Sequence, residues 1–471
     1  MSFSRRSFLT GSAALGAAAL LPGIARAIPQ PTGLIAKPQT IDLFDGKGPI
    51  TEAWSFGSVP GPVLRVRQGE TLSVALQNDL PQPTTIHWHG LRLPNAMDGV
   101  PHLTQAPVKP GETFDYRFVA QDAGTFWYHP HVNSAEQVAR GLSGALIVEE
   151  ATPPEVDRDL VWVLDDWRLQ KTGALAPFGN MHDLTHGGRL GNVATVNGKY
   201  DHPLRLRAGE RVRLRLINVA NARVFGLKFL NHDPWRLAVD GHGVAPERLG
   251  DRPAVVPPGG RLDLILDATG TPGDKTEIHD VAYARSAYML AEIHYSEDTP
   301  LRTEALPAPA RLAANPVPTP DLANAETIPM AFQGGAMGGM AQARYQGQMM
   351  GLRELASLGM VWAVNGEIIP RIEPGNIGSP LLDLKLGRSY ILRWGNETAF
   401  DHPIHLHGHS VWVLGRNGTR VATPEIQDTV LVRPRETVEV AFVADNPGDW
   451  ALHCHVLEHA EAGMMGFARV S

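Results

Sequence analysis

The chain has 471 residues, of which 19% are charged and 7% are aromatic, and its formal net charge at pH 7 is −7. This length is too great for one hydrophobic core and fits roughly three domains. The negative charge argues against nucleic acid as a partner. The 48 glycines and 38 prolines are typical of an all-β protein in which turns separate many short strands.

The N-terminal segment has the features of an export signal. Arg5 and Arg6 precede an apolar stretch, and Ala25 and Ala27 form a small-residue cleavage site. This pattern predicts a twin-arginine signal peptide over residues 1–27. The alternative is a membrane anchor, but the apolar run is shorter than the ~20 residues that span a bilayer. We therefore expect a periplasmic protein without stable membrane insertion after cleavage.

The rest of the chain repeats one strand pattern three times. Each copy has an alternating strand, a turn with glycine and a second alternating strand, at 64–80, 204–220 and 382–398. A further strand pattern follows each copy, at 108–120, 256–268 and 432–444. These repeats predict three Greek-key β-sandwich domains. We place their boundaries near 150 and 315, which gives domains at 28–150, 151–315 and 316–471.

The second copy is rich in arginine, at positions 205, 207, 211, 213 and 215. An anionic partner is one explanation for these arginines. Because the arginines alternate along strands, we instead expect them to form one solvated face of a sheet.

Histidines are concentrated in four short segments of the chain. HWHG carries His87 and His89, WYHPH carries His129 and His131, and the other two segments carry His402, His405, His407, His409, His453, His455 and His459. Imidazole clusters of this kind suit copper or zinc. A structural zinc site needs only four ligands, so copper accounts better for so many histidines.

The C-terminal segment also contains Cys454, the only cysteine of the chain. A blue-copper centre uses two imidazoles, a thiolate and a weak axial thioether, and here His459 and Met464 follow the cysteine. Side chains of a strand point alternately to opposite faces. His453 and His455 therefore point away from Cys454, so that one strand can serve two copper sites.

An internal alignment distinguishes the domains. Residues 122–131 align without a gap with residues 446–455, which matches the histidine pairs and puts Pro130 opposite Cys454. Only the third domain can therefore hold a blue-copper site. The middle domain has neither histidine pair, so we expect it to bind no copper and to act as a spacer between the other two.

These segments, HWHG, WYHPH, HPIHLHGH and HCHVLEHAEAGMM, resemble those of the three-domain multicopper oxidases over the whole mature chain. The resemblance implies three cupredoxin-like domains and four copper ions, one of type 1, one of type 2 and two of type 3. It implies a type 1 site of His402, Cys454 and His459 with Met464 axial, and His87 and His405 on the type 2 copper. The implied type 3 ligands are His89, His129 and His455 on one copper and His131, His407 and His453 on the other.

The same resemblance implies electron transfer from a donor at the type 1 copper to dioxygen at a trinuclear cluster, which yields water. Asp98 matches the position of an acid that the family uses for proton delivery, although an aspartate before glycine is also a common turn residue. The family often has a second acid directly after the histidine that matches His459. Here Ala460 stands there and Glu461 follows, so either Glu461 substitutes or proton delivery differs.

The donor is less evident from the sequence. Residues 330–360 carry Met330, Met337, Met340, Met349, Met350 and Met360, half of the twelve methionines, and part of this segment could form a helix. Thioethers select Cu(I), and the segment resembles the methionine-rich insertions of copper-efflux cuprous oxidases. Methionine is also a common apolar filler.

Three hypotheses follow for the function. A periplasmic cuprous oxidase comes first, a laccase-like oxidase of phenols or aromatic amines second, and a copper-binding envelope protein without activity third. By default we expect a monomer.

Overall fold

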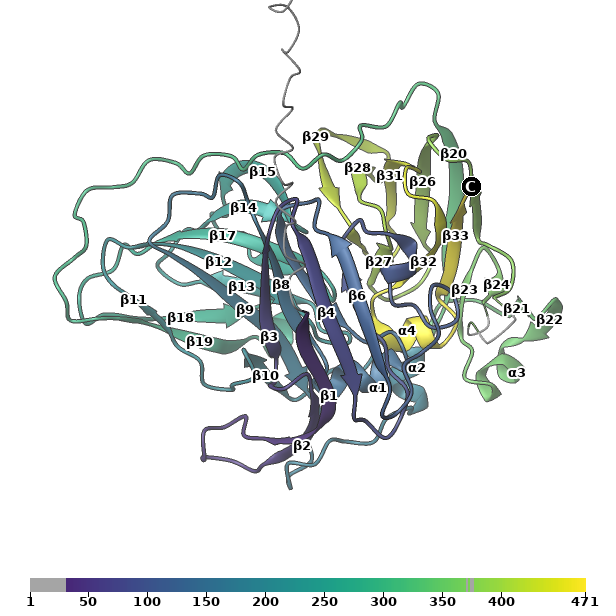
Figure 1. The fold of residues 1–471 in the computed structure, drawn as a ribbon, viewed down its shortest axis with the longest axis horizontal. Helices are drawn as coiled ribbons and strands as arrows, with labels where there is room; N and C mark the ends of the chain where they lie inside the picture. The colour runs from purple at the N-terminus through teal and green to yellow at the C-terminus, as the bar shows by residue number, and fades with distance from the viewer. Residues whose placement is uncertain (1–30, 370–371, 373–376) are drawn as a thin grey trace, which may run out of the picture. The chain divides into compact units, whose positions relative to one another are not determined.

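The computed structural model describes residues 31–369, 372 and 377–471, so the predicted signal peptide lies outside the described residues. Strands dominate the described chain and form six sheets (Figure 1). Each sheet draws its strands from one third of the chain, and we name the three resulting sets the N-terminal, middle and C-terminal sheet pairs. The prediction of an all-β fold is confirmed.

The elements of the three sheet pairs follow one another along the chain. The N-terminal pair contains β1 (Thr32–Ile41), β2 (Thr51–Ser55), β3 (Gly61–Arg67), β4 (Thr71–Asn78), β5 (His87–His89), β6 (Thr113–Val119), β7 (Gly124–His129) and β8 (Gly144–Glu149), with η1 (Asn95–Met97) and α1 (Ser134–Ala139) between strands. The middle pair contains β9 (Arg158–Trp167), β10 (Val193–Val196), β11 (Leu204–Leu206), β12 (Arg211–Asn218), β13 (Phe225–Phe229), β14 (Trp235–Val239), β15 (His242–Arg248), β16 (Ala254–Val256), β17 (Arg261–Asp267), β18 (Lys275–Asp280) and β19 (Tyr288–Tyr295), with α2 (Met181–Thr185) and η2 (Ala284–Ser286). The C-terminal pair contains β20 (Glu326–Gly334), β21 (Gln342–Tyr345), β22 (Gln348–Gly351), β23 (Trp362–Val364), β24 (Glu367–Ile368), β25 (Leu382–Leu384), β26 (Ser389–Asn396), β27 (His402–Leu406), β28 (Val411–Arg416), β29 (Thr419–Gln427), β30 (Thr429–Val432), β31 (Thr437–Val443), β32 (Gly448–Cys454) and β33 (Met465–Val470), with α3 (Leu352–Ser357) and α4 (Leu457–Glu461).

The sequence repeat corresponds to one structural unit in each pair. Its two strands are β3 and β4, β11 and β12, and β25 and β26, and in every copy they enter different sheets. The glycine between them has a positive φ in each copy, 81° at Gly69, 78° at Gly209 and 78° at Gly387, a conformation that glycine adopts without steric cost. We propose that each pair is one domain, with boundaries near 150 and 315, because no strand pairing of the described residues joins two pairs.

The packing of the core brings the two ends of the chain together. One cluster of buried apolar side chains extends through both the N-terminal and the C-terminal pair and includes Trp88 and Trp450, whereas the middle pair encloses a cluster of its own. Burial of this apolar surface makes the largest favourable contribution to the free energy of folding. The strands that carry the histidines therefore lie against each other although more than 300 residues separate them.

The expected solvated face of arginines is wrong for β12. Arg213 and Arg215 are 0% and 1% exposed, because this face of the middle pair packs against β7 of the N-terminal pair. Arg213 donates to Asp263 at 2.6 Å, and Arg215 donates to Thr125 of β7 at 2.9 Å. The alternating pattern thus marks an interior ion-pair network, in which each buried charge has a partner.

We expect Asp263→Ala to lower the free energy of unfolding by about 3–5 kcal/mol, because it leaves buried guanidinium groups without their shared carboxylate. Urea denaturation followed by tryptophan fluorescence measures this loss. The control is Asp201→Ala, which removes the exposed ion pair with Lys47 and is expected to cost less than about 1 kcal/mol. Equal losses in the two variants would contradict the buried network.

Candidate metal centres

Two pairs of neighbouring strands hold most of the predicted histidines. In the N-terminal pair, β5 lies antiparallel to β7 with His87 opposite His129. In the C-terminal pair, β27 lies antiparallel to β32 with His405 opposite His453. The residues that the internal alignment matched therefore also occupy matching positions in the two strand pairs.

His402, Cys454 and His459 form one compact group on the C-terminal pair. The Cys454 Sγ atom lies 3.5 Å from His402 Nδ1 and 3.7 Å from His459 Nδ1, and the two Nδ1 atoms are 3.2 Å apart. His459 Nε2 donates to the carbonyl of His186 at 2.6 Å, which leaves its Nδ1 as the atom free to bind a metal. Outer hydrogen bonds of this kind fix the tautomer of ligand histidines.

The thiol of Cys454 is fully buried, and burial raises its pKa above the usual value. A metal ion displaces the proton from such a thiol, because the thiolate is the ligand. Met464 is also buried, and its carbonyl accepts a hydrogen bond from the Cys454 amide at 3.1 Å. His402 and His459 supply two imidazoles and Cys454 supplies a thiolate, while Met464 of the same polypeptide supplies a thioether. This donor set fits a blue-copper site.

Eight further histidines meet between the N-terminal and C-terminal pairs. His87 Nε2 lies 3.4 Å from His405 Nε2, as expected for two ligands of one ion. His453 Nε2 lies 3.4 Å from His131 Nε2 and 3.1 Å from His407 Nε2, and these three form a compact group.

The third predicted set is His89, His129 and His455. The His455 ring centroid lies 4.9 Å from that of His89 and 5.4 Å from that of His129. The ring nitrogens of His89 and His129 form a compact group with a nitrogen of His87, and not with one of His455.

The outer hydrogen bonds of these rings leave nitrogen atoms for metal. His129 Nδ1 and His453 Nδ1 donate to the carbonyls of Pro130 and Cys454. Among the described residues, His89 Nδ1, His129 Nε2 and both ring nitrogens of His455 are buried without a hydrogen-bond partner. Buried polar atoms without partners are rare in proteins, and binding of a metal ion through one nitrogen of each ring accounts for His89 Nδ1, His129 Nε2 and one of the two nitrogens of His455.

Electrostatics also favour metal binding. Burial lowers the pKa of His453 to about 4 and holds the pKa values of six others well below the usual value, namely His89, His129, His131, His405, His407 and His455. Near neutral pH these rings are therefore uncharged. A neutral imidazole is the form that binds a metal ion.

The two candidate acids differ in position. Asp98 is 1% exposed, its carbonyl accepts from His87 Nδ1 at 2.9 Å and its carboxylate accepts from His407 Nδ1 at 2.9 Å. Glu461 is half-buried at the end of α4 and accepts a hydrogen bond from the Ala135 amide at 3.0 Å. It borders a cavity of about 270 Å³ that His131 and His453 also line.

The methionines of residues 330–360 do not form one cluster. Met330 is buried in the apolar cluster shared by the N-terminal and C-terminal pairs. Met360 is buried in a separate small cluster, and Met340 and Met350 are half-buried against that small cluster. Met337 and Met349 are 75% and 53% exposed. The expected helix is confined to α3 (Leu352–Ser357). The residues before it form a hairpin of β21 and β22, because Gln346 and Gly347 both have positive φ and form the tight turn that joins antiparallel strands.

Sequence reasoning missed residues that hold the histidines in place. They are His186 and Thr398 beside the Cys454 group, and Asp428, Thr429 and Arg261 beside the eight histidines. Arg261 offered one signal, since it stands where the other two copies of the repeat have Thr113 and Thr437. His409, for which no metal role was expected, is buried and donates to the His407 carbonyl.

Family comparisons agree with this geometry. Residues 45–153 and 356–471 match two family models described as multicopper oxidase. Residues 2–22 match the signal sequence of the twin-arginine translocation pathway, which indicates export across the cytoplasmic membrane. In the described chain, no helix is both long enough and apolar enough to cross a membrane.

Relatives cover nearly the whole chain. Multicopper oxidase MmcO of Mycobacterium tuberculosis is 29% identical, over 92% of this chain and 85% of its own. The structure of a multi-copper oxidase from Pseudomonas thermotolerans is 37% identical with a TM-score of 0.81, over 94% of this chain and all of its own. A laccase-like multi-copper oxidase CueO from Ochrobactrum sp. is 26% identical with a TM-score of 0.77, over 94% of this chain and 100% of its own. This chain therefore belongs to the multicopper oxidases, enzymes that bind copper and pass electrons from a reducing donor to dioxygen.

Proposed function

We propose that this oxidase holds four copper ions, with the ligands that the sequence resemblance implies. His402, Cys454 and His459, with Met464 axial, would hold the type 1 ion. His87 and His405 would hold the type 2 ion, and the six other clustered histidines would hold the type 3 pair, His89, His129 and His455 on one ion and His131, His407 and His453 on the other. The distances between ring nitrogens support the type 2 pair and the second type 3 set most directly.

Bound copper would supply one-electron acceptance at the first site and dioxygen reduction at the second. The protein supplies the connection between them, because Cys454 is bonded through the backbone to His453 and His455. These imidazoles lie in the histidine cluster while the Cys454 thiol lies in the other group. Cys454 is therefore the residue that carries electrons from one site to the other.

Proton supply is the second task of the chain. Asp98 reaches both sheet pairs through His87 and His407 and is placed to pass protons to the cluster. Glu461 lies in the cavity wall beside His131 and His453, so it can exchange protons with solvent that enters this cavity. We propose that the two acids serve in series, with Glu461 on the outer side.

We propose Cu(I) as the electron donor, taken up at a donor patch that consists of Met181, His182, His186 and Met337. The Ala336 amide donates to the Thr185 carbonyl at 2.7 Å, which places the exposed Met337 beside α2. The next residue, His186, accepts the hydrogen bond from His459, and its ring stacks on that of His182 at 4.1 Å. Thioether and imidazole groups both bind Cu(I), so the patch joins soft ligands to the predicted type 1 site.

Met337→Leu is expected to lower kcat/KM for Cu(I) by about tenfold, which corresponds to about 1.4 kcal/mol of binding free energy. Oxygen consumption with Cu(I) and with a phenolic donor measures the effect, and turnover of the phenol is expected to stay unchanged. Met289→Leu is the matched control, since Met289 is 49% exposed on β19 and belongs to no patch. Undiminished Cu(I) turnover in Met337→Leu would rule out the donor patch.

A laccase-like oxidase of phenols or aromatic amines is the second candidate. The Ochrobactrum relative is described as active towards lignin model compounds and lignosulfonate, and the Trp362 ring lies 4.1 Å from the His459 ring. Because Trp362 is fully buried, an aromatic donor would meet the electron entry point at the surface, and Trp362 would line the inner side of that point. Rapid turnover of phenols together with slow turnover of Cu(I) in the unaltered enzyme would favour this candidate over the first. The third hypothesis, a protein without activity, does not agree with the family or with the complete ligand set.

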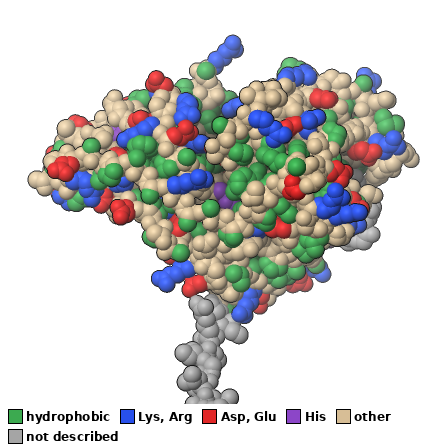
Figure 2. Space-filling model, turned by 90° about the horizontal axis from the view of Figure 1, so that it is seen from above, with side chains coloured by type: hydrophobic (Ala, Val, Ile, Leu, Met, Phe, Trp, Pro, Cys, Tyr) green, Lys and Arg blue, Asp and Glu red, His purple; other side chains and the backbone are tan. Residues whose placement is uncertain are grey.

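We propose that the mature enzyme works in the periplasm as a monomer. The signal sequence supports export. The face seen in Figure 2 has basic and acidic side chains interspersed, and this face gives no field of one sign that would attract nucleic acid.

A further inference from the structure

Asp428 holds the histidine cluster from the side opposite Asp98. Its carbonyl accepts from His405 Nδ1 at 2.8 Å, and its carboxylate accepts from His89 Nε2 at 3.1 Å. As with Asp98, one histidine belongs to the sheet pair of the aspartate and the other to the opposite pair. The two aspartates thus occupy equivalent places about the pseudo-two-fold relation of the N-terminal and C-terminal pairs.

The surroundings of the two carboxylates differ. Among the described residues, the Oδ1 atom of Asp98 accepts no hydrogen bond. Both oxygens of Asp428 are bound by the guanidinium of Arg261, through Nη1 to Oδ1 at 2.7 Å and through Nη2 to Oδ2. The hydroxyl of Thr429 also donates to Asp428 Oδ1 at 2.8 Å. A two-pronged charged contact of this kind fixes the orientation of a carboxylate.

Arg261 begins β17 of the middle pair and is itself fixed. Its side chain is buried and donates to the carbonyls of Thr125 and Gly259, each at 3.1 Å. Its amide donates to Asp240 Oδ1 at 2.9 Å. The guanidinium therefore has little freedom to follow a displaced partner.

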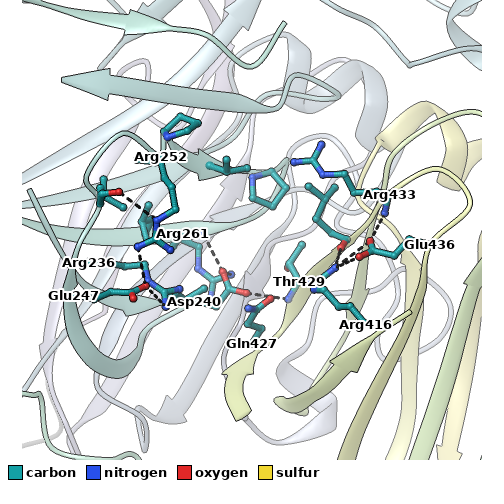
Figure 3. A pocket seen from close by; sticks show the side chains of 18 of the residues that line it. Arg236, Asp240, Glu247, Arg252, Arg261, Arg416, Gln427, Thr429, Arg433 and Glu436 are labelled. Atoms are coloured by element: carbon teal, nitrogen blue, oxygen red, sulfur yellow. Dashed lines mark hydrogen bonds and ion pairs between the residues drawn. The ribbon is translucent and has the colours of Figure 1, made fainter. Parts of the chain in front are cut away.

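Asp240 completes the connection through the backbone. Its Oδ2 atom accepts from the amides of Asp428 at 3.2 Å and Thr429 at 3.1 Å. Figure 3 shows Asp240 and Arg261 next to each other on the middle pair, facing Thr429 on β30. The middle pair thus binds both the side chain and the backbone of the segment that orients His89 and His405.

We propose that Arg261 and Asp240 are positioning residues of the trinuclear copper cluster and act through Asp428. With its Nε2 proton held by Asp428 and Thr429, His89 presents Nδ1, the nitrogen without a partner, to the metal. Without Arg261, the buried carboxylate of Asp428 loses both guanidinium contacts and is no longer held in the orientation that it has beside His89. The expected spacer is then a contributor to the site. The inference rests on the copper ligands proposed above.

A matched control lies in the same cavity. The cavity between the middle and C-terminal pairs has a volume of about 630 Å³ and is lined by Arg261, Asp240 and Thr429, and also by Arg416. Arg416 pairs with Glu436 at 3.1 Å and contacts none of the clustered histidines. Removal of either arginine changes the cavity charge equally, but only Arg261 touches Asp428.

The test compares Arg261→Met with Arg416→Met in the copper-loaded, full-length mature enzyme. Arg261→Met is expected to bind copper at the trinuclear cluster about 10–100-fold more weakly, the usual effect of losing an outer partner of a ligand. Chelator titration with copper analysis measures this loss, and the electron paramagnetic resonance spectrum of type 2 copper is expected to change. The blue absorption of the Cys454 site should persist, and Arg416→Met should match the unaltered enzyme in every measurement.

The proposal is overturned if Arg261→Met keeps the type 2 spectrum and the chelator resistance of the unaltered enzyme. A purely structural role would lower the melting temperature and leave both unchanged. If Arg261→Met does not fold, Arg261→Lys is the variant to test, because lysine keeps the positive charge but cannot bind both carboxylate oxygens of Asp428 in the way a guanidinium does. An unchanged type 2 spectrum in Arg261→Lys overturns the proposal. An unaltered enzyme that shows blue absorption but no trinuclear copper would instead refute the proposed ligands, and this inference with them.

Discussion

Cys454→Ser is expected to abolish the blue absorption of the copper-loaded enzyme and to lower oxidase turnover by more than about 100-fold. Changes to the outer partners of metal ligands already cost about 10–100-fold, and this substitution removes a ligand itself. It also removes the side chain that connects the His402–His459 site with His453 and His455. Visible absorption, copper content and oxygen consumption with either donor measure the outcome.

The trinuclear cluster is expected to survive in Cys454→Ser, because none of its histidines is altered. Its type 2 spectrum should therefore resemble that of the unaltered enzyme. Met464→Leu is the control, since it removes only the weak axial group and keeps both imidazoles and the thiolate. It should retain the blue absorption. A blue Cys454→Ser enzyme would show that the thiolate is not the type 1 ligand.

The fold and the histidine clusters could be predicted because their signals are local. Alternation along a strand gives the direction of a side chain without knowledge of its surroundings, so the HxH pairs could be assigned to one face. The gapless alignment of residues 122–131 with 446–455 then predicted equivalent strands, and β7 and β32 have the same place in their sheets. Repetition inside one chain made this comparison possible without any relative.

The errors occurred where a neighbouring sheet pair or a local turn decides the outcome. Alternating arginines have the same pattern on a solvated face as on an interface. Only the packing of this face against β7, where Arg215 donates to Thr125, distinguishes the two. In the methionine-rich segment a helix forms only over α3, because two residues with positive φ turn the stretch before it into a hairpin. Pattern and propensity are weak guides when tertiary contacts oppose them.

The outer partners of the histidines could not be predicted for a related reason. His186 acts through its carbonyl, which every residue type offers. Asp428 and Arg261 are 167 residues apart, and neither stands near a histidine pair in the sequence. Such contacts come from the assembly of sheet pairs, so they become visible only in the folded chain.

Asp98→Asn is expected to lower kcat by about 10²-fold or more, in the range that general acid–base groups contribute. An asparagine can still accept the hydrogen bond from His407, so the ring keeps its direction and the copper stays bound. It cannot carry a proton, however, and turnover is then limited by proton delivery. Steady-state oxygen consumption at saturating donor measures kcat, while anaerobic reduction of the blue band by the donor should keep its rate.

The Glu461→Gln variant, compared with Asp98→Asn, tests whether protons pass from the cavity to the histidine cluster along a single path. Glu461 lies in the cavity wall, and Asp98 lies directly against His87 and His407. If the two acids act in series, each substitution slows turnover, and the double variant is no slower than the slower single variant, because both interrupt one path. Multiplied effects would indicate two independent routes. Normal turnover in Asp98→Asn would show that Asp98 only orients His407, as Asp428 orients His89.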